Sequence, residues 1–291
     1  MKKQKYIFLA DMFIEDYIGG AELTVEALLD ECRDDVLIKR CYDVREGFIL
    51  ENRDKAWIIF NSCSLSDKNK LLIIKNVENY HCVEFDYKFC MFRNPKLHEG
   101  RTGELSSCSC ETSLLGKINL LLFNRAKNLF FMSKKQKKIY EDKFPVLRKK
   151  KEVHVLSSVF DKVALGVFRD CLKSPTSEKK GWLILGSNSP VKDTAGCIDY
   201  AKRNNLAYSV VGGVTPLHFI QQMKESAGLI FLPRAYDTCP RVTIEAKLLG
   251  CKLVMNENVQ HKDEEWFISE PLKILEYLEK RADFFWETIN A

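Results

Sequence analysis

Short apolar runs alternate with longer amphipathic segments along almost the whole sequence, and this alternation constrains the fold most. The runs are rich in β-branched and aromatic residues, and segments of helix length separate them. Such a pattern is typical of parallel α/β layers and not of β-sandwiches or helical bundles. The expected strands are residues 5–10, 35–41, 57–61, 81–85, 128–133, 181–186, 208–213, 228–233 and 252–256.

The strand and helix pattern restarts near residue 158, after a Lys-rich loop, which predicts two domains. A chain of 291 residues is long enough for two domains that each bury a core. We expect one α/β domain over residues 1–157 and a second over 158–270, with a cleft where they face each other. Residues 271–291 follow the last strand and are predicted to form a helix that begins near Pro271.

The composition excludes several classes of protein. A hydrophobic content of 46% with 29% charged residues is typical of a globular protein, and the longest apolar runs are too short to cross a bilayer. The basic and then apolar N-terminus is interrupted by acids from Asp11 onward, so we expect no signal peptide and a cytoplasmic location. The eleven scattered cysteines are therefore predicted to be reduced thiols, most of them filling space.

The net charge of +5 is modest, and much of it lies in the Lys-rich segments 133–138 and 147–152. One interpretation is that both segments are solvated surface. The other is a surface that contacts an anionic acceptor or the inner face of a membrane. Sequence-specific DNA or RNA recognition is not favoured by this charge. A dinucleotide-dependent dehydrogenase is not favoured either, because no G-x-G-x-x-G follows the first strand of either domain.

Residues 231–258 combine a strand, a loop, a helix and a second strand with two acids at fixed spacing. Pro240 can occupy the first turn of a helix, and Glu245 in the second turn leans back toward the loop that holds Asp237. Parallel sheets bind ligands beyond the carboxyl ends of their strands, and helix N-termini bind phosphates. The spacing thus predicts an anion site flanked by two carboxylates. The alternative is that Asp237 caps the helix and Glu245 faces solvent.

The segment "LPRAYDTCPRVTIEAKLLGCKLV" resembles the donor-binding motif of the retaining, nucleotide-sugar-dependent glycosyltransferases of family four, which have the GT-B fold. The spacing of Asp237 and Glu245, the proline and the "EAKLLG" tail match that motif. "YIGGAEL", "LGSNSPVKDTAG" and "VVGG" resemble three further motifs of the family, in the right order. Two departures are that the first acid is Asp instead of Glu, and that Ser187 or Asn188 stands where the family has an Arg.

This resemblance implies two Rossmann-like domains and a C-terminal helix, residues 271–291, that crosses back to pack on the N-terminal domain. It implies transfer from a UDP- or GDP-type sugar with retention of configuration and without a required metal or other cofactor. Lys192 would neutralise the diphosphate, Glu245 would accept hydrogen bonds from the ribose, Asp237 would hold the sugar, and Asp86 would lie on the acceptor side. The implied donor-binding residues are Gly19, Gly20, Gly186, Ser187, Asn188, Gly212, Gly213, Arg234, Thr238, Cys239, Pro240 and Arg241.

The alternative function is a non-catalytic protein with a degenerate transferase fold that binds nucleotide sugars or acts as a scaffold. The acceptor class stays open among glycans, lipid-linked molecules and nucleic acids, and so does the oligomeric state.

A further cluster of metal-binding residue types lies in the N-terminal half. A structural zinc ion takes four nitrogen or sulfur ligands, and the candidates are Cys90, His98, Cys108 and Cys110. The alternative is a loop of reduced cysteines, because the C-x-C spacing is not one of the common zinc knuckles.

Overall fold

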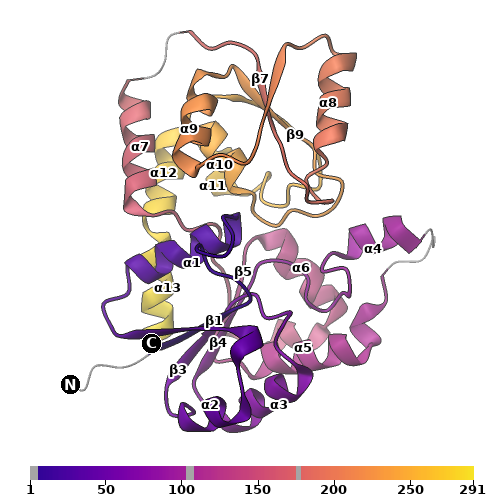
Figure 1. Ribbon diagram of the computed structural model, residues 1–291, viewed down its shortest axis with the longest axis vertical. Helices are drawn as coiled ribbons and strands as arrows, with labels where there is room; N and C mark the ends of the chain where they lie inside the picture. Colours follow the sequence, from indigo (N-terminus) through magenta and orange to yellow (C-terminus); the bar gives the residue numbers. More distant parts are fainter. Residues whose placement is uncertain (1–5, 103–107, 175–177) are drawn as a thin grey trace. The chain divides into compact units, whose positions relative to one another are not determined.

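The computed structural model describes residues 6–102, 108–174 and 178–291, which form two compact units. Unit 1 comprises the chain up to Asp161 together with Arg281–Ala291, and unit 2 comprises Lys162–Lys280. Each unit has its own parallel sheet with helices packed on it, so the predicted α/β class is confirmed (Figure 1). The units divide a few residues beyond the predicted boundary at 157/158.

Unit 1 contains a parallel sheet of six strands in the order β2-β1-β3-β4-β5-β6. Strands β1, β3 and β5 are completely buried, which explains why their sequences are continuous apolar runs and do not alternate. The strands are β1 (Tyr6–Ala10), β2 (Val36–Arg40), β3 (Ala56–Ile59), β4 (Tyr80–Glu84), β5 (Leu129–Phe131) and β6 (Val153–Val155). Residue 5 of the strand predicted over 5–10 lies outside the described residues.

Helices between these strands along the chain, together with the C-terminal helix α13, belong to unit 1. They are α1 (Gly20–Asp30), α2 (Glu46–Glu51), α3 (Asp67–Asn76), α4 (Pro95–Thr102), α5 (Leu114–Arg125), α6 (Lys134–Lys143) and α13 (Arg281–Asn290), with the short 3₁₀ helices η1 (Cys41–Asp43), η2 (Cys110–Thr112) and η3 (Pro145–Lys149). Within the parts of the chain that the structure describes, no helix has the length and apolar character to span a membrane.

Unit 2 contains a parallel sheet of four strands in the order β10-β9-β7-β8. Figure 1 shows α8 on one side of this sheet and α9 and α10 on the other. Ile184, Cys197, Ala201 and Ile230 form a buried cluster where α8 packs on β7 and β9, so Cys197 fills space as predicted. The elements are α7 (Lys162–Lys173), β7 (Trp182–Leu185), α8 (Thr194–Arg203), β8 (Tyr208–Val211), α9 (Pro216–Glu225), β9 (Gly228–Phe231), α10 (Arg241–Leu248), β10 (Lys252–Met255), α11 (Glu265–Ile268) and α12 (Pro271–Glu279).

The C-terminal segment differs from the single helix predicted over 271–291. It forms two helices, α12 and α13, because the chain is not helical at Lys280. Helix α12 packs against α7 inside unit 2, whereas α13 belongs to unit 1. There the Trp286 indole donates to Leu28 O at 3.1 Å and packs edge-on against Tyr6. The second half of the predicted helix, α13, therefore packs on the N-terminal unit, and the first half, α12, belongs to unit 2.

The Lys-rich segments are partly neutralised by neighbouring acids. Lys137 and Lys138 on α6 pair with Glu141 and Asp142 one turn on, and Arg148 pairs with Asp142 as well. Exposed pairs of this kind contribute little to stability. Contact with an anionic acceptor or a membrane surface stays a prediction.

A buried hydrogen-bond network centred on Asn128 ties α13 to the sheet of unit 1. The Asn128 amide donates to Thr288 O on α13 at 3.2 Å and lies 3.1 Å from His81 Nδ1. The carbonyl of Thr288 can only accept, so the side-chain NH₂ of Asn128 faces both partners and His81 Nδ1 is an acceptor. The amide oxygen of Asn128 lies 2.9 Å from Nε2 of His154. This network requires His81 to be neutral.

We expect acid to destabilise unit 1 through His81. Burial, with Lys127 and Lys150 nearby, lowers the pKa of His81 from 6.5 to about 4. Between pH 6.5 and about pH 4 the unfolded chain binds a proton at His81 that the folded chain does not bind. The free energy of unfolding therefore falls as the pH falls. The expected loss is about 1.4 kcal/mol per pH unit, or about 3 kcal/mol in total.

Denaturant unfolding of wild type and His81→Gln at intervals between pH 7 and about pH 4 measures this loss. The free energy of unfolding of the variant should fall less steeply with falling pH. His218→Gln, which removes an exposed histidine on α9, should keep the wild-type slope. Equal slopes in all three proteins would contradict the assignment.

Candidate active site

The topology of unit 2 places two loops side by side at the carboxyl ends of two neighbouring strands, β7 and β9. Strand β7 lies between β8 and β9, and the connections from β7 and β9 run to helices on opposite faces. This arrangement is a topological switch point, where open α/β sheets bind their ligands. The loops that leave here are the β7–α8 loop (residues 186–193) and the β9–α10 loop (residues 232–240).

Two ion pairs and one backbone hydrogen bond join these loops. Lys192 Nζ donates to Asp237 Oδ2 at 2.5 Å, and the next residue, Asp193, accepts from Arg234 at 2.8 Å. The backbone N–H of Arg234 also donates to Val191 O at 2.8 Å. The Asp237 side chain is 11% exposed and that of Lys192 is 28% exposed, so this pair is partly shielded from water. The structure thus brings together two of the four predicted catalytic residues.

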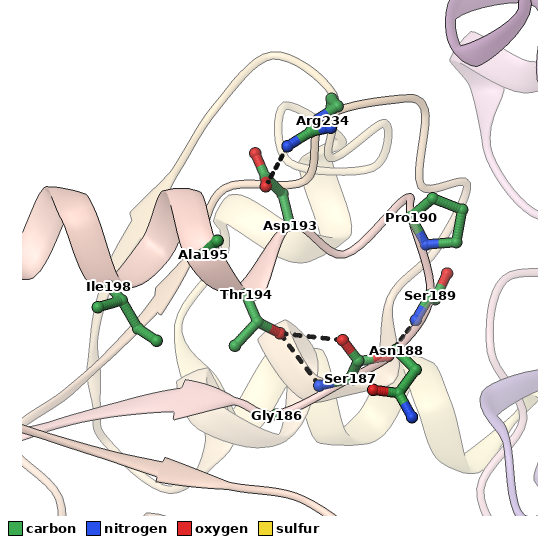
Figure 2. A pocket seen from close by; sticks show the side chains of 10 residues that line it. All are labelled: Gly186, Ser187, Asn188, Ser189, Pro190, Asp193, Thr194, Ala195, Ile198 and Arg234. Carbon is green, nitrogen blue, oxygen red and sulfur yellow. Dashed lines mark hydrogen bonds and ion pairs between the residues drawn. The ribbon is translucent and has the colours of Figure 1, made fainter. Parts of the chain in front are cut away.

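Figure 2 shows the hollow formed by the β7–α8 loop and the start of α8, with a volume of about 540 Å³. The Thr194 hydroxyl accepts from the backbone N–H of Ser187 at 3.0 Å and donates to Leu185 O at 2.8 Å, which shapes the loop. Predicted donor-binding residues supply part of the lining, together with Asp193 and Thr194: they are Gly186, Ser187, Asn188 and Arg234. Lys192, Asp237 and Glu245 do not line this hollow.

The second predicted acid, Glu245, lies near the N-terminus of α10. Pro240 is the N-cap, one position before the first helical residue, so the prediction that it occupies the first turn is wrong by one residue. Glu245 lies in the second turn and is largely buried, with Oε1 3.7 Å from Arg241 Nε. Burial raises the pKa of Glu245, and Arg241 opposes this rise. The alternative in which Glu245 faces solvent is therefore wrong. Thr238 and Cys239, in the loop before α10, are buried as well.

The segment after β10 holds the β9–α10 loop in place. The backbone N–H of Asp237 donates to Asn258 O at 2.8 Å, and Asp237 O accepts from Gln260 N at 3.0 Å. The side-chain amides of Asn256 and Asn258 both donate to Pro233 O. These supporting residues are not among those predicted from the sequence. The one feature of the sequence that could have indicated them is their position just beyond the carboxyl end of an expected strand.

Two glycines at the ends of β7 and β8 permit close backbone contact. A Cβ on Gly212 would lie 2.2 Å from Gly186 O, so any larger residue there forces the two strand ends apart. Gly213 has φ +68°, which favours glycine. Gly186 and Gly212 therefore let the ends of β7 and β8 approach closely, and Gly186 also lines the hollow.

Unit 1 contains the remaining predicted site residues, among them Asp86, which lies in an ion-pair network. Its carboxylate accepts from Arg93 Nε at 2.6 Å and lies 3.5 Å from Lys88 Nζ. Burial opposes ionisation of Asp86, but Lys88 and Arg93 outweigh it and lower its pKa. Lys88 also donates to the fully buried Glu84, whose pKa burial raises. Lys88 and Tyr87 are buried.

The carboxyl ends of β1 and β3 form the switch point of the unit 1 sheet, and two acids that the sequence analysis missed lie near it. The Asp11 carboxylate accepts from the backbone N–H groups of Cys63 and Ser64 at 2.7 and 2.9 Å. Burial raises the pKa of Glu22, and Asp11 contributes to this rise. A Cβ on Gly19, the N-cap of α1, would lie 2.5 Å from the Glu22 carboxylate. Gly20 is the first residue of α1, and its backbone carbonyl accepts a hydrogen bond from the Thr24 hydroxyl.

The four predicted zinc ligands also lie together in unit 1. Their candidate donor atoms are all within 4.8 Å of one another.

Comparisons with known proteins bear on the fold. No model of a known protein family matches the sequence, and no curated protein sequence matches it either. Among solved structures, Anabaena HepE in complex with UDP and glucose is 12% identical with a TM-score of 0.53, over 98% of this chain and 92% of that one. An alpha-glucosyltransferase in complex with UDP-glucose and DNA containing an abasic site is 10% identical with a TM-score of 0.51, over 99% and 94%.

A trehalose-phosphate synthase from Burkholderia xenovorans, in complex with glucose-6-phosphate, is 9% identical with a TM-score of 0.58, over 96% of this chain and 92% of that one. At such identities the likeness bears on the fold alone. Together with the two parallel α/β units, it shows that this chain has the fold of the GT-B glycosyltransferases.

Proposed function

We propose that this protein is a glycosyltransferase that moves a sugar from a UDP- or GDP-type sugar to an acceptor hydroxyl with retention of configuration. The observation that carries the proposal is the Lys192–Asp237 pair at the switch point of unit 2. It joins the two loops where an α/β sheet of this kind binds a ligand, and the second loop leads directly into the helix that carries Glu245.

The proposed reaction breaks the bond between the sugar and the diphosphate, so negative charge develops on the leaving phosphate. Lys192 and the N-terminus of α10 stabilise this charge, which is the kind of electrostatic effect that usually contributes most to catalysis. Asp237 holds the lysine in position before the donor arrives. Because these groups neutralise the diphosphate, the proposal requires no metal ion.

The remaining roles follow the resemblance in sequence. Glu245 accepts hydrogen bonds from the ribose hydroxyls, and Asp237 with the amides of Thr238 and Cys239 holds the transferred sugar. The leaving phosphate takes the proton of the acceptor hydroxyl as the new bond forms on the same face of the sugar. Asp86 is proposed to lie on the acceptor side. That Gly19 and Gly20 let the backbone approach the donor stays a prediction.

The proposal is tested first by donor binding. The two glucosyl-donor complexes among the similar structures make UDP-glucose the first nucleotide sugar of a thermal-shift panel, followed by other UDP- and GDP-sugars. A true donor present at 100 times its Kd stabilises the protein by about 2.7 kcal/mol. We expect one nucleotide sugar to raise the melting temperature and to be hydrolysed slowly. No response to any of them would contradict both the enzyme and the non-catalytic binder.

Transfer is tested next with the donor that binds. The acceptor panel contains glycans, lipid-linked acceptors and DNA, the last because one similar structure contains DNA. Proton NMR of the product shows whether the anomeric configuration is retained, and added Mg²⁺ or Mn²⁺ should leave the rate unchanged. Binding with neither hydrolysis nor transfer would support the non-catalytic alternative instead.

A further inference from the structure

Three cysteine sulfurs surround one histidine nitrogen in unit 1. His98 Nδ1 lies 3.6 Å from the Cys90 sulfur, 3.3 Å from that of Cys108 and 3.4 Å from that of Cys110. The sulfurs of Cys90 and Cys108 are 3.6 Å apart. An imidazole Nδ1 either donates its one proton or accepts one at its single lone pair, so one hydrogen bond accounts for one sulfur and not for all three.

These distances match the edges of a zinc tetrahedron. With a Zn–S length of about 2.3 Å and a Zn–N length of about 2.0–2.1 Å, tetrahedral ligands lie about 3.8 Å apart for two sulfurs and about 3.5 Å apart for nitrogen and sulfur. At 3.6 Å, the sulfurs of Cys90 and Cys108 are too far apart for a disulfide, whose S–S length is about 2.05 Å, and all three cysteines of the cluster are free thiols. Tetrahedral sites of sulfur and nitrogen are typical of zinc.

Backbone N–H groups and one aromatic ring contact the residues of this cluster. Backbone N–H groups of Phe92 and Asn94 hydrogen-bond to the Cys90 sulfur, and that of Cys110 hydrogen-bonds to the Cys108 sulfur. The Phe92 ring packs on the His98 ring with the centroids 4.7 Å apart, which fixes the imidazole orientation. Such outer contacts orient the ligands of structural metal sites.

Further contacts fix the backbone that carries the ligands. Lys143 on α6 donates to Cys108 O and to Glu111, and Glu99 on α4 accepts from the backbone N–H of Cys108. A Cβ on Gly116 would lie 2.3 Å from Cys110 O, so α5 can approach the 3₁₀ helix at Cys110 only because residue 116 is glycine. The ligands are thus held from three separate elements.

We propose that unit 1 binds a structural zinc ion through four side chains: Cys90, His98, Cys108 and Cys110. Four protein ligands leave no open position for a substrate, so the ion has a structural role. It links the turn after β4, helix α4 and the start of η2. This turn also contains Arg93, the partner of Asp86, so the ion would stabilise the loop that positions that carboxylate.

The test is made on the full-length chain, expressed without a histidine tag and purified without chelator. Elemental analysis should give one zinc ion per wild-type chain. Cys110→Ser should bind zinc at least about 100-fold more weakly, since even the loss of an outer contact costs about 10- to 100-fold. Cys32→Ser removes one half-buried cysteine outside the cluster and should keep the full zinc content.

A second measurement uses wild type alone and so does not depend on how the variants fold. Replacing zinc by Co²⁺ should give the intense visible bands of tetrahedral cobalt and a thiolate-to-cobalt charge-transfer band. The proposal is overturned if wild type binds neither metal, if Cys110→Ser and Cys32→Ser hold equal zinc, or if the intact mass shows a disulfide in place of the metal. None of these measurements requires a donor, so they stand apart from the test of transfer.

Discussion

Lys192→Met should lower kcat for sugar transfer by about 10²- to 10³-fold, the loss typical when one preorganised donor to a developing oxyanion is removed. Methionine keeps the length of the side chain but carries no charge to neutralise the leaving diphosphate. It also leaves the Asp237 carboxylate, 11% exposed, without the ammonium that lies 2.5 Å away. Initial rates at saturating donor and acceptor measure the effect, and a melting curve shows that the fold is retained.

The matched control for this loss is Lys180→Met. Lys180 lies in the same unit and also forms an ion pair, with Glu178 at 3.0 Å, but its side chain is 79% exposed. Removing it should leave kcat unchanged within about twofold, because exposed pairs contribute only about 0–1 kcal/mol. If Lys192→Met turns over as fast as Lys180→Met, then Lys192 only joins the two loops and the proposed role in catalysis is wrong.

The contact between Lys192 and Asp237 also shows where prediction from the sequence stops. Each residue could be proposed separately, because each follows a recognisable apolar run and matches a family motif in sequence. Their contact could not be predicted, since it depends on β7 and β9 being neighbours, and strand order is not contained in local periodicity. The same holds for Asp193 and Arg234, which are far apart in the sequence.

Short or interrupted elements account for other differences between the predicted and the observed structure. Strand β6 is three residues long and follows a Lys-rich loop, so its apolar character is too brief to detect. The break between α12 and α13 falls within an amphipathic stretch and depends on which unit each half packs against. The ion pair between Asp86 and Arg93 could not be predicted either, because it depends on a left-handed backbone at Arg93, φ +55°, which no pattern in the sequence indicates.

The cysteine and histidine cluster was predicted as a set of residue types and not as a geometry. Cys90 and His98 are eight positions apart, and residues 103–107, between His98 and Cys108, lie outside the described residues. Only the folded turn after β4 brings the Cys90 sulfur to the helix that carries His98. Residue types therefore identify candidate ligands, while backbone turns decide whether their atoms meet.

Glu245→Gln should remove the ability of the protein to distinguish a ribose nucleotide from its deoxyribose analogue. If the carboxylate accepts hydrogen bonds from the ribose hydroxyls, wild type should bind UDP or GDP about 10- to 100-fold more tightly than the deoxy form, since a hydrogen bond to a charged group contributes about 1.5–3 kcal/mol. The amide keeps the shape of the side chain without its charge, so in the variant the two affinities should approach each other. Titration calorimetry with both nucleotides measures the four affinities.

The competing explanation is that Glu245 serves only as the buried partner of Arg241, whose Nε lies 3.7 Å away. In that case Glu245→Gln would lower the melting temperature, because it removes the charged carboxylate that lies beside the buried guanidinium of Arg241. The preference for the ribose nucleotide would then equal that of wild type. Glu276→Gln, at an exposed position on α12, should change neither property. The ratio of the two nucleotide affinities separates the explanations even if the variant is less stable, because any loss of folded protein reduces both affinities equally.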